Sequence, residues 1–187
     1  MTSILEVEQL DTLSSNASST ITIGGTNTTT IAFGPNVTTT PSILANTPAF
    51  IARCTTAFSV PNNTWAKAQF NTEDLDTDNA YDNSNYRFTV PSGGAGMYVF
   101  GARVNVENID DVERVDVNLY KNGSQDIYTW EQQFSPGTNN IIAPQTVHAY
   151  SLSVGDYIEA YVRHNEGTTT GMQAERNIFF GYRLIGA

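Results

Sequence analysis

The sequence predicts an all-β protein, and three observations support that prediction. Short runs of β-branched and aromatic residues alternate with polar residues along much of the chain. Clusters of Gly, Asn and Pro separate these runs. Helix-forming stretches are scarce, with only two lysines in 187 residues. Many short strands separated by turns are typical of a β-sandwich or jelly roll.

The strands expected in the first half of the folded region are short. Residues 49–54 begin the first strand, a turn follows at 61–63, and 65–70 continue the sheet. Residues 73–82 read as an acidic loop, which leads to a strand at 86–90. The Pro- and Gly-rich residues 91–96 form a turn. Cys54, the only cysteine, lies in the apolar alternation and is expected to be a buried, unreactive thiol.

The second half has the cleanest periodicity. Tyr98, Phe100 and Ala102 alternate with other residues in a strand that runs to position 106, and Val115, Val117 and Leu119 repeat the pattern. Asn-Gly at 122–123 predicts a two-residue hairpin turn. Further strands are expected at 127–130, 147–154, 157–162 and 178–185.

The last of these strands is apolar on both faces. Ile178, Phe180, Tyr182 and Leu184 lie on one side, with Phe179 and Ile185 on the other. A strand of this kind must be covered on both sides, so we expect a second subunit to provide one cover.

Residues 1–47 form a separate zone, followed by a folded domain at 48–187. The first zone is rich in Ser, Thr and Asn, with short β-prone runs between Gly and Asn turns. One chain cannot bury so few apolar residues, so this arm either winds with other chains around a shared thin core or is a low-complexity linker.

Composition excludes several classes of function. The net charge of -10 repels polyphosphate and anionic lipid, so neither nucleic-acid binding nor membrane docking is expected. The apolar runs are too short for membrane insertion, and the N-terminal residues lack the features of a signal peptide. We therefore expect synthesis in a cytoplasm without a secretion signal.

The folded region resembles the C1q/TNF-like family in a series of motifs that keep the family's order. They are Phe70, Tyr81-Asp82, residues 85–91, Gly96, Tyr98-Val99-Phe100, residues 119–123, residues 152–158 and residues 179–184. The resemblance implies a jelly-roll sandwich of ten strands, packed as a homotrimer. It also implies that some of Phe100, Tyr161, Phe180 and Tyr182 lie near the trimer axis.

The chain differs from animal C1q proteins because it has no collagen-like Gly-X-Y tract. Its Ser/Thr/Asn-rich lead instead resembles the stems of bacteriophage fibre and spike proteins, which often end in trimeric knobs. A virion protein leaves the cell by lysis, so this resemblance agrees with the missing signal peptide.

Motifs for catalysis are missing from the sequence. There is no Gly-x-Ser-x-Gly elbow, Walker loop, dinucleotide fingerprint or paired Cys/His metal motif, and His148 and His164 lie in or beside predicted strands. We expect a protein that is not an enzyme and has no cofactor.

Calcium is the one metal that the sequence suggests. Asp74, Asp76 and Asp78 place oxygen ligands at alternate positions, which suits Ca²⁺, and some C1q-like trimers bind calcium near their axis. The alternative is a solvated acidic loop. A second acidic patch, which includes Asp116, is expected to be a solvated face.

Four aromatic residues are candidates for ligand contact. Rings with nearby Asn and Asp side chains can stack on sugars and hydrogen-bond to them. The alternative is a place in the core or in an interface. The candidates are Tyr120, Tyr128, Trp130 and Tyr157.

Three functions stay open at this point. The first is a phage fibre or spike whose trimeric knob binds a glycan or protein of the host surface, with residues 1–47 docked on other virion proteins. The second is a capsid decoration protein that cements three-fold sites. The third is a soluble bacterial C1q-like lectin or ligand. The first two place the protein in the virion.

Overall fold

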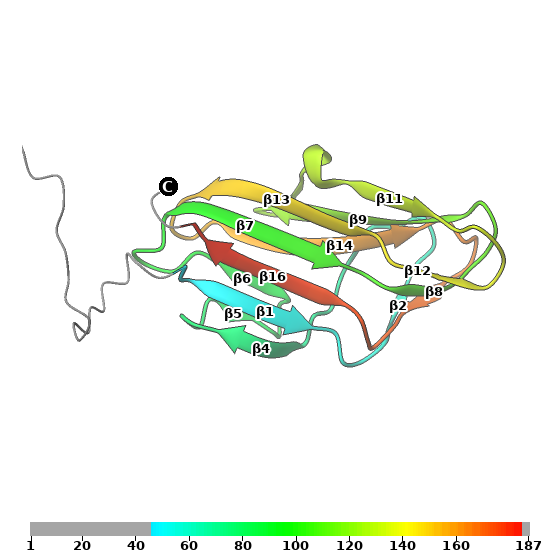
Figure 1. Cartoon of the computed structure of the whole chain (residues 1–187), viewed down its shortest axis with the longest axis horizontal. Coiled ribbons are helices and arrows are strands. Elements are labelled where there is room, and N and C mark those ends of the chain that lie inside the picture. The colour runs from blue at the N-terminus through cyan, green and yellow to red at the C-terminus, as the bar shows by residue number, and fades with distance from the viewer. Residues whose placement is uncertain (1–45, 185–187) are drawn as a thin grey trace, which may run out of the picture. The chain divides into compact units, whose positions relative to one another are not determined.

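The computed structural model describes residues 46–184 (Figure 1). These residues form sixteen strands and one short 3-10 helix, η2. The strands are β1 (Ala49–Arg53), β2 (Phe58–Val60), β3 (Ala66–Lys67), β4 (Thr72–Asp76), β5 (Tyr81–Asp82), β6 (Arg87–Thr89), β7 (Gly96–Arg103), β8 (Val106–Ile109), β9 (Arg114–Lys121), β10 (Ser124–Gln125), β11 (Glu131–Phe134), β12 (Asn140–Ile142), β13 (Gln145–Leu152), β14 (Tyr157–His164), β15 (Thr170–Met172) and β16 (Ile178–Arg183), and η2 spans Ile127–Thr129. Several strands have only two or three residues, which explains why sixteen segments replace the expected ten.

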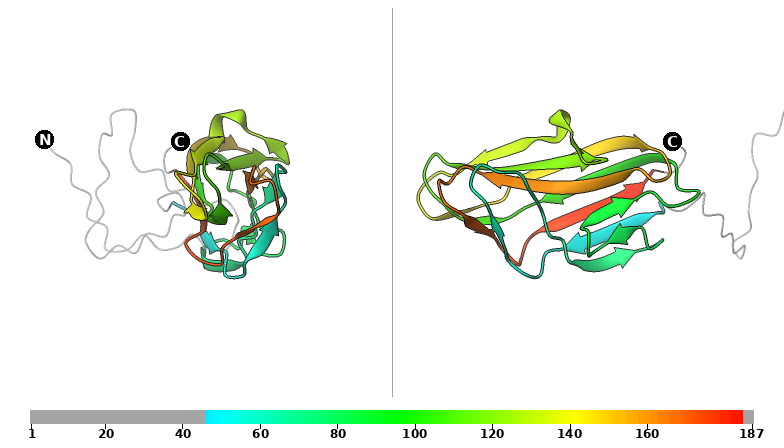
Figure 2. Two further views of the ribbon diagram at one scale, coloured as in Figure 1. Left: turned by 90° about the vertical axis from the view of Figure 1, so that its right-hand side faces the viewer. Right: turned by 180° about the vertical axis from the view of Figure 1, so that it is seen from behind.

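Two larger antiparallel sheets stack face to face (Figures 1 and 2). The first sheet has the order β13-β7-β16-β1-β4. The second has the order β10-β9-β14-β6-β5, with β11 paired to β9 and β3 paired to β14. A small sheet, β12-β8-β15-β2, lies at one end, and β1 begins and β16 ends at the opposite end (Figure 1). The prediction of an all-β jelly-roll sandwich is confirmed.

The core lies between the two large sheets and is rich in aromatic rings. Val115, Val117 and Leu119 of β9 are fully buried, as their alternation predicts. The ring centroid of Phe50 lies 5.2 Å from that of Phe88 in a stacked arrangement and 4.9 Å from that of Phe179 in an edge-to-face arrangement. The contact with Phe88 of β6 joins the two sheets across the sandwich, whereas the contact with Phe179 of β16 lies within the first sheet.

The predicted hairpin at Asn122-Gly123 is confirmed, since both residues have positive φ (52° and 75°), as this type of turn requires. The Asn122 amide Nδ2 donates to Asp156 Oδ1 at 2.9 Å, which ties this turn to the one between β13 and β14. Hydrogen bonds from the Ser153 amide and from Asn122 hold the pKa of Asp156 below its usual range.

Two elements differ from the sequence prediction. Residues 127–129 form a 3-10 turn rather than a strand, because the Asp126 side chain accepts the Tyr128 amide and caps the turn. The supposed acidic loop contains strand β4, which pairs with β1 and places Leu75 beside Ile51. Charged residues suit β4 because it is an edge strand.

The predicted arm at 1–47 lies outside the described residues except for its last two, as does Ile185, so the arm and its boundary at 47/48 stay predictions. Within residues 46–184, none of the helical structure is long and apolar enough to cross a membrane.

Candidate functional site

The first candidate surface is the outer side of the first sheet, which we call the apolar face. The pairing of neighbouring strands places its side chains next to one another. Ile51 lies beside Phe180, and Tyr182 lies between Ala49 and Val99. Val147 on β13 is 63% exposed, and Leu75 on β4 is also exposed. The apolar face consists of Ala49, Ile51, Leu75, Val99, Val147, Ala149, Phe180 and Tyr182.

Glycines let the aromatic rings lie flat on both sides of this sheet. Phe180 pairs with Gly101 across β16 and β7, and Gly181 pairs with Phe100 in the next register position. A Cβ on Gly101 would lie 2.5 Å from Cε1 of Phe180, and one on Gly181 would lie 2.5 Å from Cε1 of Phe100. Each ring therefore occupies the space that a side chain on the neighbouring strand would fill.

The predicted last strand is apolar on both faces, as expected. Phe179 is fully buried on the core side, and Phe180 and Tyr182 are half-buried on the apolar face. Two of the four residues expected near the trimer axis, Phe100 and Tyr161, do not lie on the apolar face. Phe100 has no exposed surface and belongs to the core, so it cannot contact a second chain. Tyr161 is on the second sheet, because β14 pairs with β9 rather than with the strands of the first sheet.

The second candidate surface is the solvent side of the second sheet, where four aromatic residues and one arginine form what we call the aromatic platform. The Trp65 and Trp130 rings meet edge to face, with centroids 5.9 Å apart. Tyr120 and Tyr161 stack at 3.8 Å, and Trp65 lies 6.3 Å from Tyr120. The Arg163 guanidinium lies 4.9 Å from each tryptophan ring. Trp130 is 37% exposed, and the other three rings are half-buried.

Buried carboxylates lie beneath this platform. Asp116 is the cross-strand neighbour of Arg163, accepts from its Nη2 at 2.7 Å, and accepts from Arg114 Nε at 3.1 Å. Lys67 Nζ lies 2.6 Å from Glu159 Oε1. The Asp116 side chain is only 1% exposed, whereas its two arginine partners remain partly exposed. The expectation that Asp116 belongs to a solvated acidic face is wrong, because Arg163 from the neighbouring strand and Arg114 from its own strand cover it.

The phenols of the platform stay protonated. Burial, with the nearby Glu159 carboxylate, raises the pKa of Tyr161 to about 12, and burial also raises the pKa of Tyr120. Both hydroxyl groups are therefore neutral hydrogen-bond donors across the physiological range.

The four predicted ligand contacts do not all meet. Tyr120 and Trp130 join the platform, together with Trp65 and Tyr161, which the sequence analysis did not select as ligand contacts. Tyr157 lies on the same strand as Tyr161 and packs on Arg87 at 4.7 Å.

Tyr128 lies apart from the platform. It is 80% exposed, at the rim of a groove of about 750 Å³ between η2 and β13. The His148 and Tyr150 side chains also line this groove.

The predicted calcium ligands do not converge. Asp74 forms an ion pair with Arg53, Asp76 accepts the Ala80 and Tyr81 amides at 3.0 and 2.8 Å, and Asp78 accepts the Thr77 hydroxyl at 2.6 Å. Within residues 46–184, no three acidic, His or Cys groups are placed to hold a metal ion. Asp76 instead fixes the backbone of the turn after β4, and Asp74 ties β4 to β1 through Arg53.

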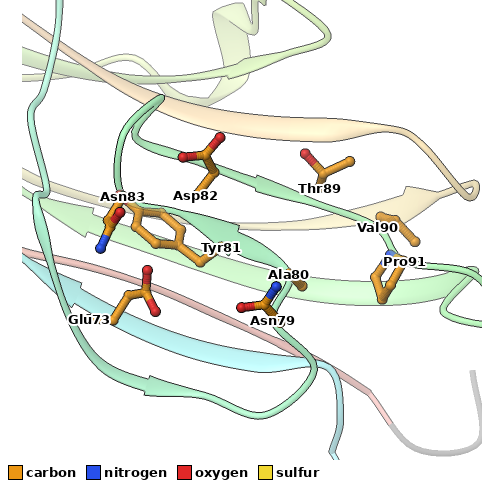
Figure 3. A pocket seen from close by; sticks show the side chains of 9 residues that line it. All are labelled: Glu73, Asn79, Ala80, Tyr81, Asp82, Asn83, Thr89, Val90 and Pro91. Atoms are coloured by element: carbon orange, nitrogen blue, oxygen red, sulfur yellow. The ribbon is translucent and has the colours of Figure 1, made fainter.

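A pocket of about 670 Å³ lies next to that turn, and none of the three predicted ligands lines it. Figure 3 shows the carboxylates of Glu73 and Asp82 on either side of the Tyr81 ring. Burial and the charges of Asp76 and Asp82 raise the pKa of Glu73, so the ionised form of Glu73 is disfavoured. A raised pKa of this kind does not by itself indicate a bound ligand.

His164 and Cys54, whose side chains are of types that can take part in catalysis, are both buried in the fold. His164 is fully buried, and its Nε2 lies 2.8 Å from the Val60 carbonyl oxygen. Cys54 is buried as predicted, its Sγ donates to the Thr56 carbonyl at 3.1 Å, and burial raises the pKa of its thiol. A raised pKa keeps this cysteine in the unreactive thiol form.

The fold is shared with several solved structures. The globular domain of zebrafish complement 1qA is 15% identical, with a TM-score of 0.53 over 73% of this chain and 97% of that one. Eiger TNF from S. frugiperda is 15% identical, with a TM-score of 0.56 over 74% of this chain and 93% of that one. Murine APRIL is 12% identical, with a TM-score of 0.54 over 73% and 98% of the two chains. At these identities the likeness concerns the fold alone.

No curated protein sequence matches the chain. The model of the C1q domain matches residues 49–184, which is most of the chain and nearly all of its described part. The chain therefore belongs to the C1q domain family.

Proposed function

We propose that this chain is a non-enzymatic binding protein that works as a homotrimer assembled through the apolar face. The observation that carries the proposal is an outer sheet surface with eight apolar residues, several of them aromatic or branched, on a chain of net charge -10. A contiguous apolar surface on a protein otherwise so acidic is typical of an interface.

Membership of the C1q domain family supports a closed trimer of this kind. The position of Phe180 and Tyr182 also supports it, because residues 46–184 leave both side chains only half-buried. The family resemblance implies that some of Phe100, Tyr161, Phe180 and Tyr182 lie near the trimer axis, and Phe180 and Tyr182 are the two of these that lie on the apolar face.

A matched pair of substitutions tests the proposal. Val147 on the apolar face is 63% exposed, and Val154 in the turn between β13 and β14 is 54% exposed, so an aspartate at either position costs the protomer little. Val147→Asp should leave a folded monomer, because assembly would bury an unpaired charge. Val154→Asp should assemble like the unmodified chain. If both variants keep the same assembly state, the apolar face is not the interface.

For the biological setting we propose a phage virion, in which the trimer is the knob of a fibre or spike that contacts the host surface. The support is the Ser/Thr/Asn-rich composition of residues 1–47, which suits a stem or a docking arm. Antibody-gold labelling of virions tests the setting: label on fibres or the tail supports the proposal. Label spread over the head would indicate capsid decoration, and the absence of label on any particle would leave a soluble C1q-like ligand or lectin.

A further inference from the structure

The aromatic platform lies on the solvent side of the second sheet, away from the apolar face of the first. It contains both tryptophans of the chain. The four rings stabilise the sheet through their mutual contacts, and because they lie outside the core, part of their apolar surface stays open to a ligand.

The rings are held in position before any ligand arrives. Arg163 lies against both tryptophans, at 4.9 Å from each ring. Asp116 fixes Arg163 through two nitrogen atoms, Nε at 2.9 Å and Nη2 at 2.7 Å. Since Asp116 is itself buried, this chain of contacts is rigid, and little conformational entropy is lost when a ligand binds.

The exposed groups determine which ligand chemistry fits. A ligand meets aromatic rings, a guanidinium group and neutral phenols, because the carboxylates of Asp116 and Glu159 are buried beneath them. Sugars offer a complementary surface: apolar C–H faces that stack on rings, and hydroxyl oxygens that accept hydrogen bonds. The Arg163 charge is balanced by Asp116, so the site does not demand an anionic ligand.

We propose that the aromatic platform binds neutral carbohydrate chains, with Trp65 and Trp130 as the stacking surface and Arg163 and Tyr120 as hydrogen-bond donors. The net charge of -10 disfavours the alternative of stacked nucleotides, because it repels a polyphosphate backbone. This inference rests on the proposed binding function and names its ligand class. It does not depend on the trimer, whose interface is tested separately at Val147.

Tryptophan emission reads this site directly, because no tryptophan lies elsewhere in the chain. The full-length protein is titrated with neutral hexasaccharides of glucose, mannose, galactose and N-acetylglucosamine, and with oligothymidine. Shallow sites bind weakly, so titrations extend to about 10 mM. At least one hexasaccharide should give a saturable shift in emission, and oligothymidine should give none. If no hexasaccharide shifts the emission, or only oligothymidine does, the proposal is overturned.

Variants locate the binding. Trp130→Ala should weaken binding of the active hexasaccharide by about tenfold or more, as the loss of an aromatic anchor does, with Trp65 still reporting. Phe134→Ala is the matched control, since Phe134 is 57% exposed on β11, next to β9, but outside the platform, and this variant should bind normally. Unchanged binding by Trp130→Ala would overturn the proposal.

A second measurement needs no variant. Saturation-transfer NMR on the unmodified protein should show the ring protons of the active hexasaccharide receiving magnetisation from aromatic side chains. Transfer from aliphatic protons alone would place the sugar elsewhere and overturn the proposal.

Discussion

The pairing of Phe100 with Gly181 makes a sharp prediction about stability. Phe100 and Phe50 are both buried, and a Cβ on Gly181 would lie 2.5 Å from Cε1 of the first ring and 2.8 Å from Cε1 of the second. Neither ring has solvent to move into, so Gly181→Ala must displace the packing between the two sheets.

The expected cost follows from typical overpacking energies. Forcing one extra carbon into a tight core costs about 1–3 kcal/mol. The lower backbone entropy of alanine in the unfolded chain offsets roughly 0.5–1 kcal/mol of this. A net loss of about 1–2 kcal/mol corresponds to a fall of about 3–7 °C in the melting temperature of a domain of this size.

Gly101→Ala is the matched control, because it introduces the same methyl group on the other side of the same sheet. There the clash is with Phe180, whose half-exposed ring can turn toward solvent. Thermal unfolding followed by circular dichroism at low protein concentration, where assembly contributes least, should show the larger fall for Gly181→Ala. An unchanged melting temperature for Gly181→Ala, or a larger fall for Gly101→Ala, would refute the packing account.

Other substitutions and conditions test the electrostatic account. Asp116→Asn removes the carboxylate shared by two arginines and should cost about 1–3 kcal/mol in urea unfolding, less than a fully buried pair because the arginines stay partly exposed; an unchanged midpoint would contradict this. The raised pKa of Glu73 means that its charge destabilises the fold at neutral pH, so Glu73→Gln should raise the melting temperature at pH 7 and have no effect below about pH 4. The lowered pKa of Asp156 means that its charge stabilises the fold, so Asp156→Asn should lower the melting temperature at pH 7. This loss should fade as the pH falls through the low pKa of Asp156. A change of the melting temperature in the same direction for Glu73→Gln and Asp156→Asn would refute this account of the two carboxylates. Because Asp74, Asp76 and Asp78 do not converge, EDTA should leave the melting temperature unchanged, and a fall that calcium reverses would reveal a site.

The sequence predicts which face of a sheet a side chain occupies better than it predicts which side chains lie beside it on neighbouring strands. Alternation along β9 places Val115, Val117 and Leu119 in the core, because side chains on a strand point to opposite sides in turn. The sequence predicts the position of this hairpin turn equally well, since Asn122-Gly123 has the residues that positive φ requires. Residues 127–129 read as a strand but form a 3-10 turn, for which Asp126, a residue type that caps such turns, is the one local signal.

Register between distant strands is the information that the sequence lacks. Phe100 and Phe180 both resemble interface aromatics in the sequence. In the paired strands β7 and β16 they occupy adjacent positions, so Phe100 points into the core and Phe180 points to the apolar face. The platform depends on the same kind of information, because Tyr161 meets Tyr120 only once β14 is aligned with β9. Asp116 likewise looks solvated until β14 brings Arg163 opposite it.

The central claim is that the apolar face joins identical chains, and the molar mass of the unmodified protein tests it most directly. Sedimentation equilibrium of the full-length chain at micromolar concentration should give about 61 kDa, three times the 20.4 kDa of one chain. A single species of 20.4 kDa at that concentration would contradict the account, because the apolar face would then be open to solvent.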